Sequence, residues 1–205
     1  TDLLLKGIMG PLNDPQTNFL ETIRANVERM SKMVSDLSDI NKIDGDRLSL
    51  QFEPVDAGDA VEEALKPLRG RIAEKGQMVQ NEIPDGLPPV WGDRARVVQV
   101  LRSLLEDAVQ YTPEGGTLAL KADVAPDEAG HLRFEVQDTG IGIPVDEQDR
   151  IFEPFFRASD EETRATPGNG LSLHLARKLV DLQAGEISFE SVRGEGSVFS
   201  VVLPI

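Results

Sequence analysis

An acidic residue followed by two glycines is the feature of this sequence best suited to bind a ligand. The segment Asp138-Thr139-Gly140-Ile141-Gly142-Ile143-Pro144 comes directly after a strand-like run, residues 131–136. Because glycine has no Cβ and tolerates positive φ, the backbone at Gly140 and Gly142 can approach a ligand closely. A carboxylate beside such a turn, here Asp138, can accept a hydrogen bond from an exocyclic amine, which is how proteins recognise adenine. Taken alone, the segment is also consistent with an ordinary turn.

A second glycine cluster follows about thirty residues later and opens a helix. Its sequence is Gly168-Asn169-Gly170-Leu171-Ser172-Leu173. Helix N-termini attract phosphate because their first N–H groups lack intrahelical partners and the helix dipole is positive there. The two clusters together favour a site for a purine nucleotide.

Composition and charge exclude several classes of protein. The chain has 205 residues, of which 40% are hydrophobic and 28% charged, values typical of a globular protein with a real core. No apolar run approaches the roughly 18 residues of a membrane span, and the N-terminal residues lack the core of a signal peptide. The absence of cysteine excludes disulfides, thiolate catalysis and Cys-ligated zinc, and agrees with a cytoplasmic location. A net charge of −15 disfavours binding to nucleic acid or to a membrane surface.

A long amphipathic helix is expected near the N-terminus. Asp14 as N-cap, followed by Pro15, predicts where it starts. Apolar residues then recur at alternating spacings of four and three, at Phe19, Ile23, Val27, Met30, Val34 and Leu37, with Met33 and Ile40 widening the stripe. Such a long seam is more typical of a helical bundle between chains than of a helix packed on its own domain, although the second interpretation stays open. Residues 3–8 are expected to be the tail of a preceding helix, ended by Gly10-Pro11.

Beyond a turn at Asp44-Gly45, which marks the expected domain boundary, short strands alternate with helices. Strands are predicted over 48–52, 78–83, 88–91, 117–124, 131–136, 185–192 and 197–203. Helices are predicted over 61–72 with a break at Pro67, after an N-cap at Asp93, over 145–151, and from the second glycine cluster to Gln183. Hairpin-linked strands with interspersed helices predict an α+β fold, a two-layer α/β sandwich with the helices on one sheet face. The glycine clusters do not lie in the parallel βαβ context of a dinucleotide-binding fingerprint, which is therefore rejected.

Four segments in a fixed order resemble those of a known family. They are Leu104-Leu105-Glu106-Asp107-Ala108-Val109-Gln110-Tyr111-Thr112-Pro113-Glu114-Gly115-Gly116, then 138–144, then Ile151-Phe152-Glu153-Pro154-Phe155-Phe156-Arg157, then 168–173. They resemble the N, G1, F and G2 boxes of a sensor histidine kinase, whose ATP-binding fold is shared with gyrase-type topoisomerases. The resemblance covers essentially the whole chain. It implies a partial dimerisation and phosphotransfer segment at 1–44, with its first helix mostly missing, and a catalytic ATP-binding domain at 45–205.

The resemblance implies a role for each matching residue. Asp138 would bind the adenine amine, and Gly140 and Gly142 would let the loop pass the base. Gly168, Gly170 and Leu171 would hold phosphates at a helix N-terminus. Residues 157–167 would form a lid over ATP, with Arg157 and Arg164 as its cations for phosphate, although a solvated loop charge is an equally good interpretation of Arg164. Tyr111 resembles the aromatic residue found beside the nucleotide.

Several positions depart from the family's pattern. Ser103, Asp107 and Gln110 lie at i, i+4 and i+7, on one polar stripe expected to face the triphosphate. Asp107 stands where the pattern has asparagine; it could still ligate Mg²⁺, but without the metal its charge would repel polyphosphate. The lysine usual at Gln110 is missing, and Ser172 replaces a further glycine. Ser103 cannot serve as the glutamate base of the related ATPases, which disfavours a free ATPase of the topoisomerase type.

The resemblance therefore implies the catalytic portion of a two-component sensor histidine kinase, which binds Mg-ATP and transfers the γ-phosphoryl group to a histidine outside this chain. The two histidines present, His131 and His174, lie in no motif and are expected to be structural, so the phosphoacceptor is expected upstream of Thr1 and no catalytic residue is predicted here. Expected partners are a second copy, through residues 14–41, and a response regulator receiver domain. The alternative is a degenerate kinase, a dimeric signalling or scaffolding module with weak or no ATP binding.

Overall fold

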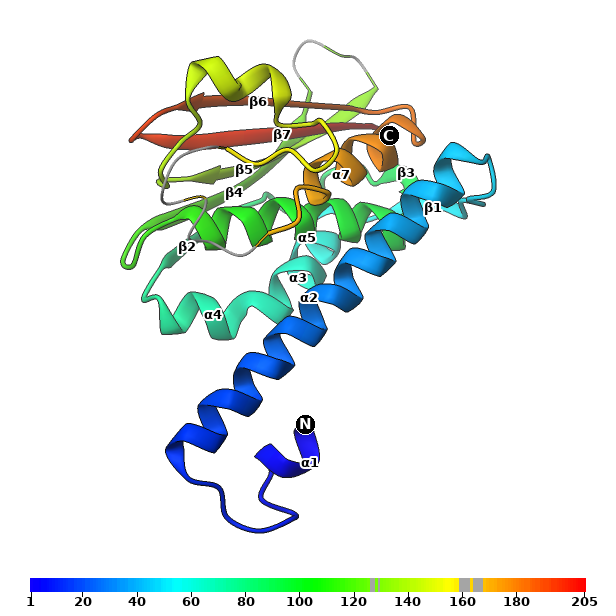
Figure 1. The fold of residues 1–205 in the computed structure, drawn as a ribbon. Helices are drawn as coiled ribbons and strands as arrows, with labels where there is room; N and C mark the ends of the chain where they lie inside the picture. The colour runs from blue at the N-terminus through cyan, green and yellow to red at the C-terminus, as the bar shows by residue number, and fades with distance from the viewer. Residues whose placement is uncertain (126–127, 129, 159–162, 164–167) are drawn as a thin grey trace. The chain divides into compact units, whose positions relative to one another are not determined.

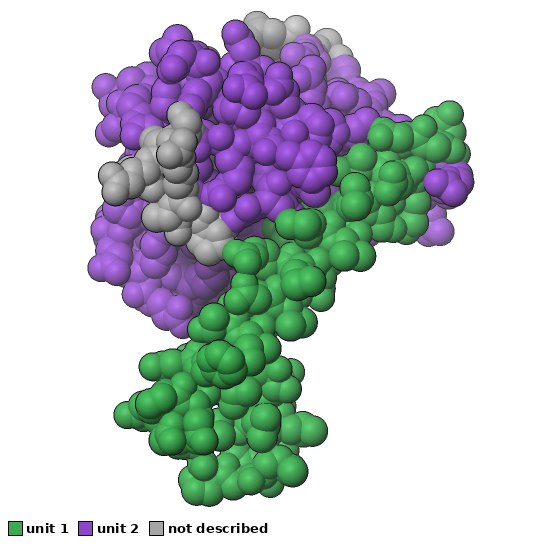
Figure 2. All heavy atoms as spheres, in the orientation of Figure 1, with its two compact units in different colours: residues 1–46 green, residues 47–205 purple. Residues whose placement is uncertain are grey.

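The computed structural model of the protein describes residues 1–125, 128, 130–158, 163 and 168–205. The chain divides into two compact units, Thr1–Asp46 and Arg47–Ile205, which Figure 2 colours separately. The second unit carries both glycine clusters and every strand found in the described ranges. Arg164 and most of the predicted lid lie outside the described residues.

The first unit consists of a short helix, α1 (Asp2–Leu5), and a long one, α2 (Asp14–Asp44). The predicted N-cap of α2 was wrong by one residue, because Asn13 caps the helix and Asp14 is its first helical residue. Asn13 Oδ1 accepts from Gln16 N at 2.9 Å while Gln16 Oε1 accepts from Asn13 N at 3.0 Å, a reciprocal capping box that Asp14 is not spaced to form. The apolar seam of α2 is largely exposed, with Phe19 and Val34 each at 68%. None of the helices in the described part of the chain is long and apolar enough to cross a bilayer.

The second unit is built on a five-stranded sheet in the order β2-β4-β5-β7-β6, visible in Figure 1. Its strands are β2 (Met78–Glu82), β4 (Thr117–Val124), β5 (His131–Asp138), β6 (Glu186–Val192) and β7 (Gly196–Pro204). The β2–β4 pair is parallel and the other pairs are antiparallel.

A separate antiparallel pair joins β1 (Phe52–Val55) to β3 (Val90–Asp93). The strand predicted over 48–52 was therefore wrong at both ends, since β1 begins only at Phe52 and continues to Val55. Phe52 lies opposite Asp93, the last residue of β3, so the short partner strand offers no pairing position to the residues before Phe52.

Helices cover one face of the five-stranded sheet (Figure 1). They are α3 (Ala57–Leu65), the 3₁₀ helix η1 (Lys66–Leu68), α4 (Arg69–Glu74), α5 (Arg94–Tyr111) and α7 (Ser172–Asp181), while η2 (Val145–Arg150) is a further 3₁₀ turn. The helical pattern breaks around Pro67, as predicted, because proline donates no N–H. Asp93 caps α5, also as predicted, with Oδ1 accepting from Arg96 N at 3.2 Å.

The core lies between the sheet and its helices. Its largest fully buried side chains include Leu101 and Leu104 of α5, Leu179 of α7, and Leu132 and Phe134 of β5. These positions follow the period of 3.6 on the helices and the period of 2 on the strand. The predicted two-layer α+β sandwich, preceded by a long helix, is confirmed.

Candidate functional site

Asp138 is a buried carboxylate at the end of β5. The residue is 7% exposed, and its Oδ1 accepts a hydrogen bond from Gly140 N at 2.7 Å. The backbone N–H of Ser197, on β7, also donates to this carboxylate. Burial raises the pKa of Asp138 to about 6, while the two N–H donors act in the opposite direction. Near neutral pH the group is therefore mostly ionised and able to accept a further hydrogen bond.

The first glycine loop, residues 138–144, packs on the C-terminal end of α5. Ile141 N donates to Tyr111 O at 3.3 Å. A Cβ at Gly140 would lie 2.8 Å from the same carbonyl oxygen, closer than side-chain atoms normally approach. Glycine at position 140 thus lets the loop come next to the helix that carries Asp107, Gln110 and Tyr111.

The hairpin between β6 and β7 holds the other side of this loop. Gly142 has a φ of +63°, and a Cβ there would collide with the carbonyl oxygen of Val192. Ile143 N donates to Ser191 Oγ at 2.8 Å, and Ser191 Oγ lies 2.9 Å from Ser197 Oγ. Gly142 therefore has a packing reason, in addition to the role beside a base that the resemblance implies.

The sequence did not predict three polar residues that hold the first glycine loop in place, Ser191, Ser197 and Gln148. Gln148 Nε2 donates to Ile143 O and to Ser191 O, both at 3.0 Å. The available signal in the sequence is that Ser191 and Ser197 flank the turn Gly194-Glu195-Gly196. Ser191 and Ser197 face each other across the β6–β7 ladder, so their hydroxyls meet beside the loop.

Tyr111 links the first glycine loop to Arg157. Its hydroxyl hydrogen-bonds with the side chains of Arg157 and Gln110. Burial raises the pKa of Tyr111, and the nearby Asp107 carboxylate raises it further. Tyr111 therefore joins Gln110 of α5 to Arg157, which comes from the aromatic segment 151–157, and lies close enough to Asp107 to sense its charge.

Arg157 in turn reaches the second glycine loop, residues 168–171. A Cβ at Gly168 would lie 3.4 Å from Arg157 Nε, which is ordinary contact distance, and Arg157 Nη2 donates to Thr163 O. The structure thus brings together residues predicted from separate segments: Asp138, Gly140, Tyr111, Asp107, Gln110, Arg157 and Gly168. Ser103 is half-buried one turn before Asp107 on α5, and its role stays a prediction.

The second glycine loop packs on the aromatic segment. Gly170 has a φ of +67°, and a Cβ there would collide with the carbonyl oxygen of Phe156. Phe155 N donates to Gly170 O at 2.9 Å, and Leu171 N donates to Asn169 Oδ1 at 3.0 Å. Leu171 is fully buried, so the loop is anchored in the core immediately before α7 begins.

The aromatic segment is seated between β6 and α7. The ring of Phe152 meets that of Phe189 edge-on with centroids 5.9 Å apart, and Arg177 lies over the Phe152 ring at 5.4 Å. His174 Nδ1 lies 2.9 Å from Phe152 O; because a carbonyl can only accept, Nδ1 carries the proton. This contact gives His174 a role in holding α7 to the aromatic segment. Within the described ranges, no group of three or more His, Cys, Asp or Glu side chains is arranged to hold a metal ion.

Comparison with known proteins agrees with this fold. Residues 92–205 match the family described as "Histidine kinase-, DNA gyrase B-, and HSP90-like ATPase". The chain therefore belongs to this family, and the resemblance to sensor histidine kinases is confirmed. A curated relative, Histidine protein kinase DivJ of Caulobacter vibrioides, is 32% identical over 205 residues, which are 100% of this chain and 34% of DivJ. Among eight curated relatives, the chain spans 24% to 46% of their own length.

Two solved structures of histidine kinases are similar to this chain. Full-length ShkA in complex with AMPPNP has a TM-score of 0.77 and 26% identity, covering 95% of this chain and 40% of ShkA. Histidine kinase ThkA in complex with response regulator protein TrrA has a TM-score of 0.71 and 25% identity, covering 98% of this chain and 57% of that chain.

Proposed function

We propose that this chain is the ATP-binding catalytic portion of a cytoplasmic two-component sensor histidine kinase. It binds Mg-ATP and transfers the γ-phosphoryl group to a histidine outside residues 1–205. One observation carries the proposal: a buried, ionised carboxylate, Asp138, is joined through Tyr111 and Arg157 to a second glycine loop at the start of a helix. A purine nucleotide needs an acceptor for the amine of its base and positive charge for its phosphates. The ShkA complex with AMPPNP, a relative's structure, supports the same ligand class.

At the base end, Asp138 accepts a hydrogen bond from the exocyclic amine of adenine. A carboxylate has about four lone-pair sites, and two N–H donors already use part of that capacity. The remaining capacity suits an amine donor. Guanine presents a carbonyl oxygen at the equivalent position, which the carboxylate would repel, so ATP is preferred over GTP.

At the phosphate end, Arg157 and the N-terminus of α7 supply positive charge. Phosphoryl transfer depends on positioning and charge neutralisation more than on covalent help from the protein. Asp107 fits as a ligand for Mg²⁺, because the ion takes one or two carboxylates together with phosphate oxygens. When bound, Mg²⁺ supplies the positive charge that the Asp107 carboxylate and the phosphates both require.

The phosphoacceptor is a histidine of another segment, since neither histidine here is suited to the role. His131 begins β5, and His174 is held against Phe152 O. The exposed seam of α2, within residues 14–41, is the surface through which a second copy would pair. A response regulator receiver domain would accept the phosphoryl group next; the ThkA structure contains a response regulator protein, which supports a partner of this kind.

A second function, a degenerate kinase that binds ATP weakly or not at all, is favoured by Asp107. Its negative charge raises the pKa of Tyr111, and in the proposed site it would also face the phosphates. Two unit charges about 4 Å apart repel by roughly 4 kcal/mol at an effective dielectric near 20, enough to remove metal-free binding.

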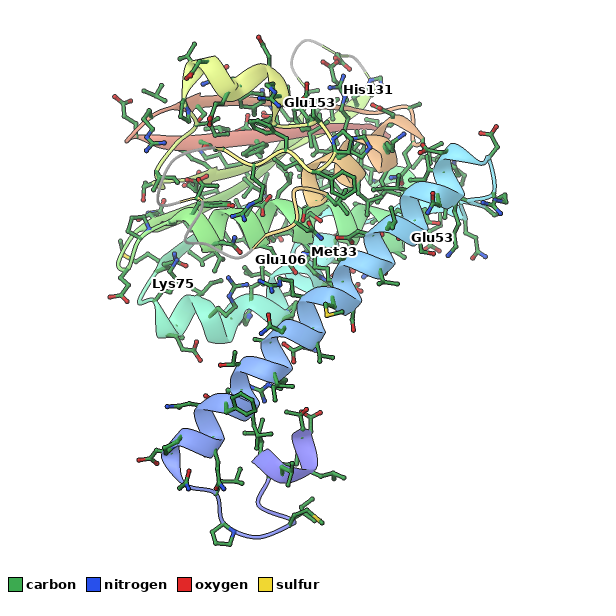
Figure 3. The ribbon with its side chains drawn as sticks, in the orientation of Figure 1. Met33, Glu53, Lys75, Glu106, His131 and Glu153 are labelled. Atoms are coloured by element: carbon green, nitrogen blue, oxygen red, sulfur yellow. The ribbon has the colours of Figure 1, made fainter. Side chains whose placement is uncertain are left out.

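Isothermal titration separates these two functions. ATP and GTP are titrated into the 205-residue chain with and without Mg²⁺, and then into Asp107→Asn. The matched control is Glu106→Gln, which removes a charge one residue away on α5 (Figure 3). Mg²⁺-dependent binding of ATP by the parent, with weaker binding of GTP, supports the kinase. Binding that appears only in Asp107→Asn supports the degenerate module.

A further inference from the structure

The C-terminal end of α5 is held from outside the helix by Lys75, which follows α4. Lys75 Nζ donates to Val109 O at 2.8 Å, to Gln110 O at 3.1 Å and to Thr112 O at 2.6 Å. These three bonds use all three donors of the ammonium group. The last carbonyls of a helix have no intrahelical donor, and the helix dipole is negative there, so a cation is well suited to the position. Lys75 is labelled in Figure 3.

Gln77, two residues later, reinforces this attachment. Its Nε2 donates to Val109 O at 3.1 Å and to Thr112 O at 2.7 Å, and its side chain is buried. The backbone of the same segment joins the turn after α5, because Gly115 N donates to Lys75 O at 2.9 Å. The end of α5 is thus fixed to the segment 75–77 by side-chain and backbone bonds.

Tyr111 O lies between the carbonyls that Lys75 binds and has a different donor. Ile141 N donates to Tyr111 O at 3.3 Å. Among the carbonyls of residues 109–112, all of them in the described part of the chain, this is the one that Ile141 N binds. It also borders Gly140, whose backbone N–H donates to Asp138 Oδ1 and so fixes the carboxylate. The position of Tyr111 O therefore determines how the first glycine loop sits on α5.

We propose that Lys75 is a positioning residue for nucleotide binding. By holding the carbonyls on both sides of Tyr111, it places the Tyr111 carbonyl against the first glycine loop and the Tyr111 hydroxyl next to Arg157. Lys75 itself does not touch the nucleotide. The effect of Lys75 on nucleotide binding rests on the proposed ATP site. Its effect on the position of Tyr111 does not depend on that site.

The test compares Lys75→Met and Lys75→Arg with the parent chain. The matched control is Lys121→Met, because Lys121 is a lysine of β4 that pairs with Glu82 at 3.6 Å. Tyr111 is the only tyrosine in the sequence, so ¹³Cζ-tyrosine labelling gives a single resonance that reports its hydroxyl environment. Isothermal titration with Mg-ATP and Mg-ADP gives the affinities, and thermal unfolding gives the stabilities.

Lys75→Met is expected to weaken ATP and ADP alike by about tenfold, since loss of charge-assisted hydrogen bonds typically costs at least that factor. Both ligands should lose affinity because they share the adenine base, which lies against the first glycine loop in the proposed site. The Tyr111 resonance should move, and the Ile141 amide should exchange faster with solvent. Lys75→Arg keeps the charge and should recover most of the affinity, while Lys121→Met should change none of these values.

A merely stabilising helix cap predicts a different pattern. Lys75→Met would then lower the melting temperature but leave the Tyr111 resonance, the Ile141 amide and the affinity of the folded protein unchanged, which would overturn the inference. If the parent chain binds no nucleotide, the proposed function fails, and the resonance and the amide exchange still decide the role of Lys75. Should Lys75→Met not fold, Lys75→Gln keeps two donors and provides the same readouts.

Discussion

Replacing Asp138 with asparagine should weaken ATP binding and at the same time stabilise the nucleotide-free protein. Burial raises the pKa of Asp138 from 3.8 to about 6. The difference of about 2 units corresponds to about 3 kcal/mol, at roughly 1.36 kcal/mol per unit. The folded protein binds this proton more tightly than the unfolded chain does, so stability falls as pH rises through this range. The cost of the buried charge is therefore absent below about pH 3.8, still small near pH 4 and nearly complete above about pH 6.

The asparagine variant carries no charge at any pH, so its advantage over the parent should depend on pH. At pH 8 the variant should be more stable by up to about 3 kcal/mol, which is roughly 6–12 °C in melting temperature for a domain of this size. Near pH 4 the parent and the asparagine variant should have similar melting temperatures. Thermal unfolding at both pH values measures this difference, with Asp146→Asn, an exposed residue of η2, as control.

The same substitution should reduce ATP affinity by about 10–100-fold, because a hydrogen bond to a charged acceptor is worth about 1.5–3 kcal/mol. Isothermal titration at pH 8 measures the loss. Two results would refute the reasoning that a buried, ionised Asp138 recognises adenine. One is an affinity equal to that of the parent, and the other is a variant that gains no stability at pH 8.

Gly142→Ala should unfold or displace the first glycine loop, because its φ is +63° and the new Cβ would collide with a carbonyl of β6. Gly115→Ala, with a φ of +74° but nothing within 4 Å, should cost only about 1 kcal/mol; equal melting temperatures for the two variants would contradict this account. Val34→Glu should abolish self-association through the seam of α2, while Asn18→Glu, on the opposite side of the helix, should not. Sedimentation velocity measures the self-association of both variants. A parent chain that stays monomeric at high concentration would contradict the proposal that two copies pair through α2.

Sequence patterns predicted the fold well wherever the determining chemistry is local. β4 was predicted over the residues it occupies, and Asp93 was recognised as the N-cap of α5, because alternation and capping depend on neighbours in sequence. One error came from a non-local contact and another from a local choice. β1 begins four residues later than its alternation suggests, because the residues before Phe52 have no partner in the short strand β3. Asn13 and Asp14 are both good N-caps, and only the reach of Gln16 decides between them.

The sequence predicted the residues of the candidate site, but it did not predict the contacts that hold these residues in place. Glycines in loops pointed to a ligand, whereas Gly142 and Gly170 are also required by packing against Val192 and Phe156. No motif predicts that Lys75 binds carbonyls more than thirty residues away, because that contact depends on the parallel pairing of β2 with β4. The roles expected for Ser103 and Gln110 at the triphosphate remain predictions, as does that of Arg164, outside the described residues.

The position of β7 in the sheet has a consequence for biosynthesis. This strand, formed by Gly196–Pro204, lies between β5 and β6 and pairs with both. In a nascent chain whose β7 residues are still inside the ribosome, β5 and β6 lack this partner. Their unpaired edges can then pair with other chains. Until Ser197 arrives, the Asp138 carboxylate also lacks one of its backbone donors. The sheet and the pocket at its end are therefore completed together, once β7 has been made, and a premature stop before Gly196 would remove an interior strand and leave a product prone to aggregation.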